Sequence, residues 1–551
     1  MIQHLRWQAI IILSGMILLS SLLAYLAFTR TTVIVPERGG TYVEGLAGRP
    51  QRLNPILCQY NSVDQDLVSL IFSGLTKVGE ANQIVPDLAR SWEISDDGLT
   101  YTFHLRHNVR WHDGVPFTAD DVVFTVKAMQ DPHYRGAPHL GSLWRSVKVR
   151  RVDDYTVEFT LKEPFTPFLD YTVIGILPAH LLAEVKAEDF PESEFNLRPI
   201  GTGPFRLEEA DAKHAVLEVN PYFYGPKPYL NRIEFKFYRS YRDVYNAYKR
   251  GEVEGIGRIP FEDLPTLALE PQLNLFSAPL SGYAIVFLNL SNPHTPFFRE
   301  KEVRQALLYG LNRQRIIDRI LHGYGLVAHS PIVPQSWAYY EGVIKYNYDP
   351  EQAIALLEEE GWHLSSDGIR RKGSTRLEFT LLSDSHPRRR KLVEEIARQW
   401  REIGVRAIPQ VGSVSDALRS RRFDAVLVDL EIPPDPDLYP FWHQTQIEGG
   451  QNYSGFDHRE ASEVLEEARR ITDQTKRIEL YRRFQEIFAE EVPSLLLYYP
   501  VYTYAVDKRI KGVQVGPIIN PSDRFRNIAQ WYIATKRVIV SQVKGGSCQV
   551  K

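Results

Sequence analysis

The feature that most limits the fold of this chain is its N-terminal apolar run. Ala9–Phe28 are 20 residues without a charged side chain, enough to cross ~30 Å of hydrocarbon as a helix. Trp7 and Tyr25 stand near its two ends, where amphipathic rings prefer a membrane interface. A cleaved signal peptide has a shorter apolar region and small residues before its cleavage site, whereas Tyr25 precedes Ala27 by two positions. We predict that residues 1–36 form an uncleaved membrane anchor, with a removed signal as the alternative.

No second apolar stretch approaches spanning length, so residues 37–551 are expected to be soluble. The chain is 44% hydrophobic and 24% charged without a low-complexity tract, which excludes a disordered, collagen-like or coiled-coil protein. Its length predicts about three or four domains, and its net charge of −3 gives no reason to expect nucleic-acid binding. Two cysteines, Cys58 and Cys548, cannot form a disulfide framework, and whether they pair stays open.

The two halves of the chain differ in their periodicity. The first half predicts three β-hairpins, each with a short polar connection between alternating strands. These are residues 91–95 with 99–106, 147–152 with 155–162, and 205–209 with 215–219. Between the first two hairpins, Thr118 and Asp121 form a capping box that predicts a helix start. The second half alternates strands over 377–382 and 423–430 with amphipathic helices, which is typical of an α/β lobe.

A search for catalytic chemistry finds none. The sequence has no phosphate-binding loop, zinc-protease motif, Cys-x-x-Cys pair or Gly-x-Ser-x-Gly elbow. The nearest approach to a metal cluster, His104, His107, His112 and Asp113, is interpreted as exposed strand and turn residues rather than as metal ligands. The basic run 388–391 opens an amphipathic helix and is interpreted as a solvated face. We therefore expect no catalytic residue, no metal and no cofactor. Aromatic residues in predicted loops, by contrast, favour a recognition site between domains.

Eight stretches of sequence, taken in order, carry a resemblance over residues 39 to 515. They are Gly39–Gly45, Leu53–Pro55, Ile84–Trp92, Ser95–Phe103, Trp111–Val122, Gly201–Phe205, Val303–Leu307 and Asn452–Phe456. Each is weak alone, but the order and separations are specific. The chain resembles the extracytoplasmic solute-binding proteins of ABC importers, in particular the oligopeptide- and dipeptide-binding family.

The resemblance implies an α/β fold of two hinged lobes, of the periplasmic-binding-protein type (type II, cluster C). It also implies an extra α+β domain and an N-terminal transmembrane helix. Lobe I would comprise residues 37–86, 196–282 and 498–551, the last including the C-terminal tail. The extra domain would comprise residues 87–195, and lobe II residues 283–497. Two chain crossings, near Tyr283 and Leu497, would act as the hinge.

The resemblance also allows the ligand residues to be tested one at a time. Peptide-binding relatives commonly hold the amino group of the ligand with an aspartate three residues before an acidic residue and a proline. Matching on Asp435 places Ile432 at that position, and isoleucine cannot neutralise an ammonium group. Either Asp429 or Glu431 has replaced the aspartate, or the ligand lacks a free amino terminus. The basic residue that some dipeptide-binding relatives use for the carboxylate falls on Ser383.

The predicted ligand-binding set has three sources: a lobe I loop that lines the cleft in relatives, aromatic or polar loop residues, and the acidic residues just discussed. Its members are Tyr60, Asn61, Ser62, Tyr283, Trp337, Asp429, Glu431, Asp435, Trp442, Asn452 and Tyr453.

The resemblance implies a monomeric, membrane-anchored receptor with residues 37–551 outside the cytoplasm. It would capture a peptide or other small solute and deliver it to an ABC permease and its ATPase subunits. It would bind no nucleic acid. Two alternatives use the same scaffold: a hydrolase based on Asp429, Glu431 and Asp435, or an anchored sensor that presents its ligand without transport.

Overall fold

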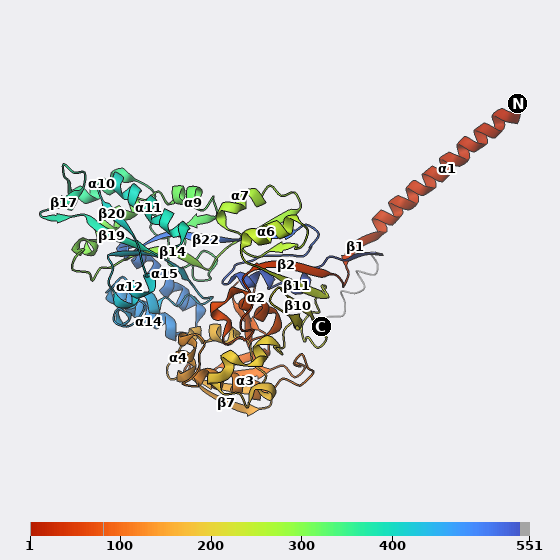
Figure 1. Cartoon of the computed structure of the whole chain (residues 1–551), viewed down its shortest axis with the longest axis horizontal. Coiled ribbons are helices and arrows are strands. Elements are labelled where there is room, and N and C mark those ends of the chain that lie inside the picture. The colour runs from red at the N-terminus through yellow and green to blue at the C-terminus, as the bar shows by residue number, and fades with distance from the viewer. Residues whose placement is uncertain (1, 81, 540–551) are drawn as a thin grey trace.

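A computed structural model describes residues 2–80 and 82–539 of the chain. Twelve of the described strands form one sheet. Ten of them follow each other in the order β20 (Arg406–Val411), β19 (Glu378–Ser383), β21 (Ala425–Glu431), β14 (Gly282–Leu288), β22 (Ser494–Asp507), β12 (Gly255–Ile256), β2 (Thr41–Ala47), β11 (Arg232–Tyr238), β10 (His214–Val219) and β9 (Phe205–Ala210). The remaining two, β13 (Leu273–Pro279) and β15 (Gly325–Val327), pair with β22. One end of this sheet belongs to lobe II and the other to lobe I (Figure 1).

The long strand β22 joins the two lobes. Its first half pairs with β14 and its second half with β13, both antiparallel. Between β13 and β14 the chain bends: the Leu280 N–H donates to the Pro500 carbonyl at 2.9 Å, and the Ser281 N–H donates to Ile518 at 2.6 Å. Two chain crossings therefore lie side by side, at residues 280–282 and 498–501. They are close to Tyr283 and Leu497, where the sequence placed the hinge.

The extra domain is a four-stranded antiparallel sheet with two helices. Its order is β5 (Ala89–Ile94), β6 (Thr100–Leu105), β8 (Thr156–Thr160) and β7 (Lys148–Asp153), with α3 (Ala119–Gln130) and α4 (Pro138–Ser146) packed beside it. Alternation on β6 buries Tyr101, Phe103 and Leu105 completely, as the pattern predicted. The capping box is also confirmed, because the Thr118 N–H donates to the Asp121 carboxylate at 2.9 Å. All three predicted hairpins are present.

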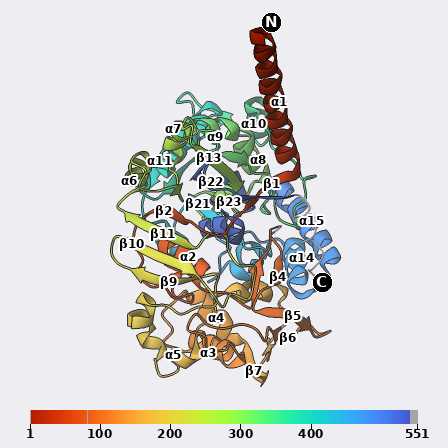
Figure 2. The same ribbon diagram turned by 90° about the vertical axis from the view of Figure 1, so that its right-hand side faces the viewer.

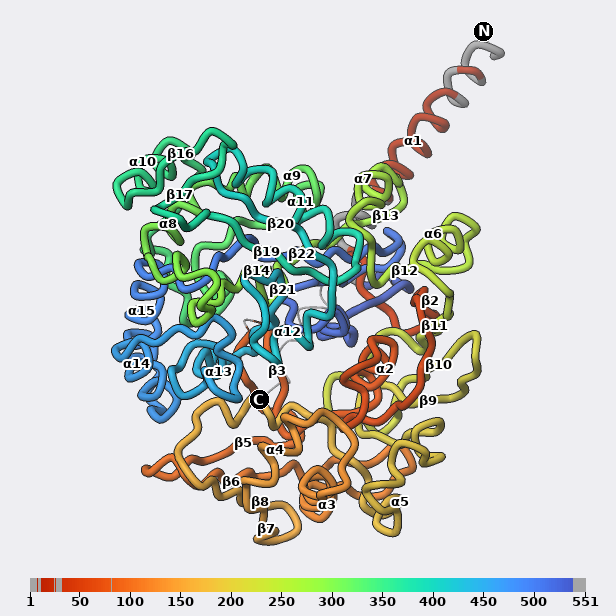
Figure 3. Tube along the Cα trace, turned by 60° about the vertical axis from the view of Figure 1, so that its left-hand side comes forward, coloured from red at the N-terminus to blue at the C-terminus, as the bar shows by residue number. Residues whose placement is uncertain are grey.

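Lobe II consists of strands covered by helices on both faces. Besides β14, β15 and β19–β21 it contains α8 (Lys301–Tyr309), α9 (Arg313–Ile320), α10 (Pro350–Glu359), α11 (Pro387–Glu402), α12 (Val414–Ser420), α13 (Tyr439–Trp442), α14 (Arg459–Arg470) and α15 (Gln474–Glu491). Leu392, Ile396 and Trp400 form the buried stripe of α11. The predicted strands over 377–382 and 423–430 correspond to β19 and β21 and are confirmed. Figure 3 shows this lobe, lobe I and the extra domain around the central strands.

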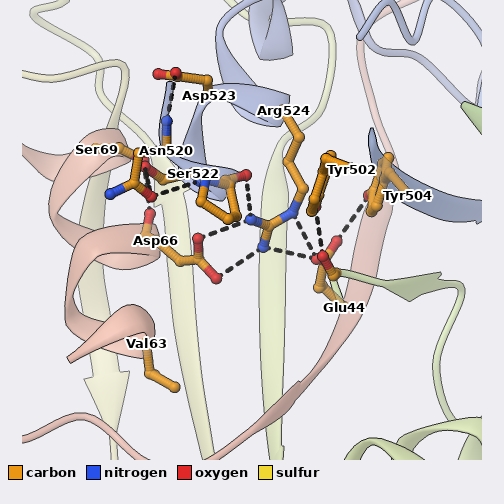
Figure 4. A network of polar contacts seen from close by, with 12 residues as sticks. Glu44, Val63, Asp66, Ser69, Tyr502, Tyr504, Asn520, Ser522, Asp523 and Arg524 are labelled. Carbon is orange, nitrogen blue, oxygen red and sulfur yellow. Dashed lines mark hydrogen bonds and ion pairs between the residues drawn. The ribbon is translucent and has the colours of Figure 1, made fainter. Parts of the chain in front are cut away.

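Lobe I is held together by a buried ion cluster around Arg524 (Figure 4). Arg524 lies in the short helix η8 (Pro521–Phe525), near the C-terminal end of the lobe. Its guanidinium donates to Asp66 of α2 (Ser62–Ile71) at 2.7 and 2.9 Å and to Glu44 of β2 at 3.0 Å. The Tyr504 hydroxyl donates to Glu44 at 2.7 Å. Because all these groups are buried, the cluster fixes η8, α2, β2 and β22 to one another.

The N-terminal segment stands apart from the rest. Helix α1 (Ile2–Thr31) projects away from the body in both views (Figures 1 and 2). It is followed by β1 (Thr32–Pro36), which pairs with β23 (Thr535–Ile539). Among the described residues, no helix combines the length and apolar character that crossing a membrane requires, and the predicted transmembrane helix is not supported.

Of the two cysteines, the structure describes one. Cys58 is a free, buried thiol, and its burial raises its pKa to about 12. Cys548 lies outside the described residues. A thiol with so high a pKa is unreactive near neutral pH, so Cys58 has a packing role.

Candidate ligand-binding site

The carboxyl end of β21 and the start of α11 meet lobe I beside the chain crossings. The Ile432 N–H donates to the Ser281 carbonyl at 2.8 Å, and the Ser281 hydroxyl donates back to the Ile432 carbonyl at 2.7 Å. On the other side of β21, the Arg388 guanidinium lies over the Phe261 ring at 5.0 Å. Arg388 belongs to lobe II, while Phe261 follows β12 in lobe I. We call this region the lobe junction and define it by Arg258, Phe261, Arg388, Asp429 and Glu431.

Lobe II contributes several neighbouring charged side chains to the lobe junction. Arg389 donates to the Asp429 carboxylate at 2.7 and 3.2 Å and also to Asp384. Its charge is therefore neutralised by two carboxylates. Arg388 has only a distant contact with Asp429, 3.9 Å between Nη2 and the carboxylate oxygen. Both arginines are partly exposed, so they remain accessible to a solute.

Glu431 and Arg258 face one another from opposite lobes. Burial raises the pKa of the Glu431 carboxyl group, and the nearby Arg258 guanidinium partly offsets this. Glu431 nevertheless has exposed surface, so solvent reaches it. Among the described residues, neither side chain makes a direct hydrogen bond or ion pair. The Glu431 carboxylate and the Arg258 guanidinium are thus available for contacts with a solute.

The predicted loop Tyr60-Asn61-Ser62 lies in lobe I at the start of α2. Tyr60 is 78% exposed, unusually so for a tyrosine at the end of a short helix. Asn61 is the N-cap of α2, because its side-chain oxygen accepts the N–H of Val63 at 2.9 Å and of Asp64 at 3.3 Å. Ser62 is half-buried as the first helical residue. Tyr60 is free to contact a solute, whereas the Asn61 oxygen is occupied by capping.

Asp435 and Trp337 surround a buried arginine in lobe II. Arg477 donates to both Asp435 carboxylate oxygens at 2.6 Å, and its guanidinium lies 5.0 Å from the Trp337 ring. The Asp435 N–H in turn donates to Asp170 of the extra domain at 2.7 Å. Asp435 is therefore part of a structural ion pair. Both of its carboxylate oxygens accept from Arg477, so they are not available to a substrate, as the hydrolase alternative would need.

The other predicted residues lie in the interior of lobe II. Tyr283, Trp442 and Asn452 have no exposed surface, and Asn452 fastens its own loop by donating to the carbonyls of His443 and Phe456. Tyr453 is half-buried with the Arg421 guanidinium 4.5 Å over its ring. A fully buried side chain cannot touch a solute in this conformation. The structure gives these residues packing roles, and their ligand contacts remain predictions.

Sequence reasoning missed Arg258, Phe261 and Arg388. The run at 388–391 was interpreted as a solvated face. In the structure, Arg388 contacts the Phe261 ring and Arg389 donates to Asp429. One signal was present: the run follows directly after β19. In α/β sheets, ligands bind outside the carboxyl ends of strands. Nothing in the local sequence marks Arg258. Over the part of the chain that the structure describes, no group of three or more His, Cys, Asp or Glu residues could hold a metal ion.

The architecture is that of a two-lobed solute-binding protein, and comparison with known families agrees. Residues 83–449 match the family model described as bacterial extracellular solute-binding proteins, family 5 Middle. The chain belongs to this family.

Its relatives bind chemically different solutes. The oligopeptide-binding protein AppA of Bacillus subtilis is 30% identical, covering 91% of this chain and 92% of its own. Its structure with a nonapeptide superposes with a TM-score of 0.71 over 91% of this chain and all of AppA. The dipeptide-binding protein of Escherichia coli is 28% identical, covering 92% and 97% of the two chains. The structure of NikZ from Campylobacter jejuni with Ni(L-His) is 28% identical, with a TM-score of 0.72 and coverage of 89% and 99%.

Proposed function

We propose that this chain is the extracytoplasmic solute receptor of an ABC importer and that it captures a peptide-like solute between its two lobes. The family membership carries this proposal, since relatives that cover almost the whole chain are named oligopeptide- and dipeptide-binding proteins. The continuous strand β22 supports it, because a receptor that closes on its ligand needs adjacent crossings that can absorb a rotation.

The lobe junction is our candidate for the solute contacts. Tyr60 adds an exposed aromatic ring from lobe I. At the junction, Glu431 is placed to receive a cationic group in the absence of an aspartate at position 432. A buried ammonium requires such a partner. Both signs of charge are thus available, which suits a zwitterionic solute.

The domain boundaries stay part of the proposal. Lobe I is assigned residues 37–86, 196–282 and 498–551, the extra domain 87–195, and lobe II 283–497. The position of the crossings at 280–282 and 498–501 supports these limits. Ligand would bind the closed arrangement better than the open one and so shift the equilibrium between them.

We further propose that the N-terminal segment holds the receptor at the membrane, with the rest outside the cytoplasm. The uncharged run 9–28 supports this, as do large apolar side chains on α1, such as Ile11 and Leu18, which are 66% and 72% exposed. Exposed apolar surface of this extent marks a site of contact with a membrane or another protein. After cell fractionation and a high-salt wash, the full chain should stay with the membranes. A wash that releases it would contradict the attachment.

The receptor is proposed to act as a monomer that docks on a separate permease with its ATPase. Native mass spectrometry of the purified full chain tests the solute proposal. We expect a retained solute with the mass of a peptide-like molecule, and stabilisation of about 2.7 kcal/mol at a concentration 100-fold above Kd. Absence of any retained solute, together with no stabilisation by peptide, oligosaccharide or metal-chelate libraries, would contradict it.

A further inference from the structure

Two arginines from opposite lobes present buried N–H groups to the lobe junction. Arg258 follows β12 in lobe I, and Arg388 lies in the first turn of α11 in lobe II. Within residues 2–80 and 82–539, the Nε atoms of both are buried and have no hydrogen-bond partner. A donor N–H that is shielded from water favours an acceptor beside it. A further acceptor is therefore expected to occupy this place.

Arg388 reaches across to the lobe I segment that carries Arg258. Phe261 comes three residues after Arg258 in the same segment, and the Arg388 guanidinium lies 5.0 Å from its ring centre. Stacking holds the flat face of a guanidinium and leaves its edge, which carries the N–H groups, free for a planar acceptor. The contact with Phe261 therefore orients the Arg388 guanidinium but provides no acceptor for its N–H groups.

The charges at the lobe junction balance in number but not in pairing. Arg389 is neutralised by Asp384 and Asp429, which leaves Arg388 with a single contact at 3.9 Å. The Arg258 guanidinium lies near enough to Glu431 to oppose the rise that burial causes in the pKa of this carboxyl group, but no direct ion pair joins the two side chains among the described residues. Arg258 and Arg388 are thus the two guanidinium groups of the lobe junction that have no direct hydrogen bond to a carboxylate of the described residues.

We infer that Arg258 and Arg388 together bind a carboxylate of the solute, which then bridges lobe I to lobe II. The inference rests on the proposed function and adds the chemical group that the solute must carry. Without a further acceptor, closure leaves N–H groups of both guanidinium groups without a hydrogen bond. With a carboxylate between them, both guanidinium groups gain acceptors, because arginine matches carboxylate geometry in a bidentate manner. The anionic group therefore favours the closed arrangement directly, and the serine at position 383 is not needed for this contact.

The test uses the full chain in detergent and two random pentapeptide pools that differ only at the carboxyl end, one a free acid and the other a C-terminal amide. Thermal unfolding and titration are measured with both pools. We expect stabilisation by the free acids and a loss of at least 10-fold in apparent affinity for the amides. In Arg258→Gln and Arg388→Gln, affinity for the free acids should fall about 10- to 100-fold, as expected when a charged hydrogen bond is lost. Affinity for the amides should stay unchanged.

Three further variants complete the design. Arg258→Lys keeps the charge and should retain part of the preference for free acids. Arg239→Gln in lobe I and Arg419→Gln in lobe II remove arginines that are 95% and 80% exposed, and both should bind like the unmodified chain. If acids and amides bind equally and the two junction variants leave affinity unchanged, the inference is wrong while the proposed function stands. If neither pool binds, the peptide-like solute of the proposed function is contradicted as well.

Discussion

Arg524 and Arg258 are both arginines of lobe I, yet their surroundings differ in every respect that matters. Arg524 is completely buried, and Asp66, Glu44 and the Pro521 carbonyl accept its N–H groups. Arg258 is half-buried, and no described residue accepts its Nε hydrogen. The N–H groups of Arg524 are all used within the fold, whereas Arg258 keeps an N–H group available for a solute.

The comparison separates charges that build the receptor from charges that await a ligand. A buried charge is tolerated only when it is paired and hydrogen-bonded, and Arg524 meets that condition without help. The Arg258 and Arg388 side chains are only partly buried, so solvent supports their charge without such pairing, and their N–H groups stay available to a solute. The predictions that follow set paired groups against unpaired ones.

The largest effect is expected from Arg524→Met. This change leaves the carboxylates of Glu44 and Asp66 buried without their cation, which costs about 3–5 kcal/mol. The full chain should unfold at a clearly lower temperature, measured by circular dichroism. An unchanged Tm would show that the Arg524 cluster does not hold lobe I together.

Asp435→Asn is expected to follow with a loss of about 2–3 kcal/mol, because it leaves Arg477 buried opposite a neutral amide. Sequence reasoning placed Asp435 among the ligand contacts, whereas its bidentate pairing gives it a structural role. Stability should therefore fall more than solute affinity does. A variant with unchanged Tm and abolished binding would restore the ligand role.

Asp170→Asn should stabilise the protein by about 1–3 kcal/mol at pH 8. Burial, together with the charge of Asp435, raises the pKa of Asp170 from 3.8 to about 8, against weaker opposition from the Asp435 N–H and then from Arg477. Between about pH 4 and 8 the unfolded chain has released a proton that the folded chain retains. The free energy of unfolding therefore falls as pH rises through this window and levels off above about 8.

The asparagine variant keeps an oxygen to accept the Asp435 N–H and has no proton to retain. Its advantage over the unmodified chain, measured by thermal unfolding at several pH values, should grow from pH 4 to pH 8. An advantage that is constant with pH, or a variant that is less stable at pH 8, would contradict this account of Asp170.

The smallest effect on stability is expected from Arg258→Gln in the ligand-free protein, within about 0.5 kcal/mol. No described partner loses a hydrogen bond when this guanidinium is removed. The variant is thus the counterpart of Arg524→Met, because both change an arginine of lobe I. Arg524→Met should lower stability, whereas Arg258→Gln should lower solute affinity. A Tm drop comparable to that of Arg524→Met would mean that Arg258 is a structural residue.

Local features of the fold could be predicted from the sequence. The hairpin β5–β6 follows from strict alternation around Asp97-Gly98, and the start of α3 follows from Thr118 and Asp121. These depend on neighbours a few residues apart. The order of strands in the large sheet was not predictable in this way, because β22 pairs with β13 and β14, more than 200 residues earlier in the chain.

The candidate site was harder to predict, for the same reason. Whether an acidic residue is free or paired depends on distant partners: Asp435 meets Arg477 and Asp429 meets Arg389, each about 40 residues away. Tyr283 and Trp442 are aromatic and stand near loops, but the sequence does not say that they fill the core of lobe II. The exposed Tyr60 and the acidic Glu431 have positions compatible with the prediction, and Arg258 carried no local signal.

The central claim, that the lobes close on a solute, is tested most directly by a distance between them. Spin labels can be attached through Arg239→Cys in lobe I and Arg419→Cys in lobe II, both highly exposed positions, with Cys548→Ser to remove a competing thiol. Cys58 is buried with a pKa of about 12 and should not react. On addition of free-acid pentapeptides, we predict that the label-to-label distance changes to a single closed value. A distance distribution that stays the same while the peptides raise the Tm would contradict closure.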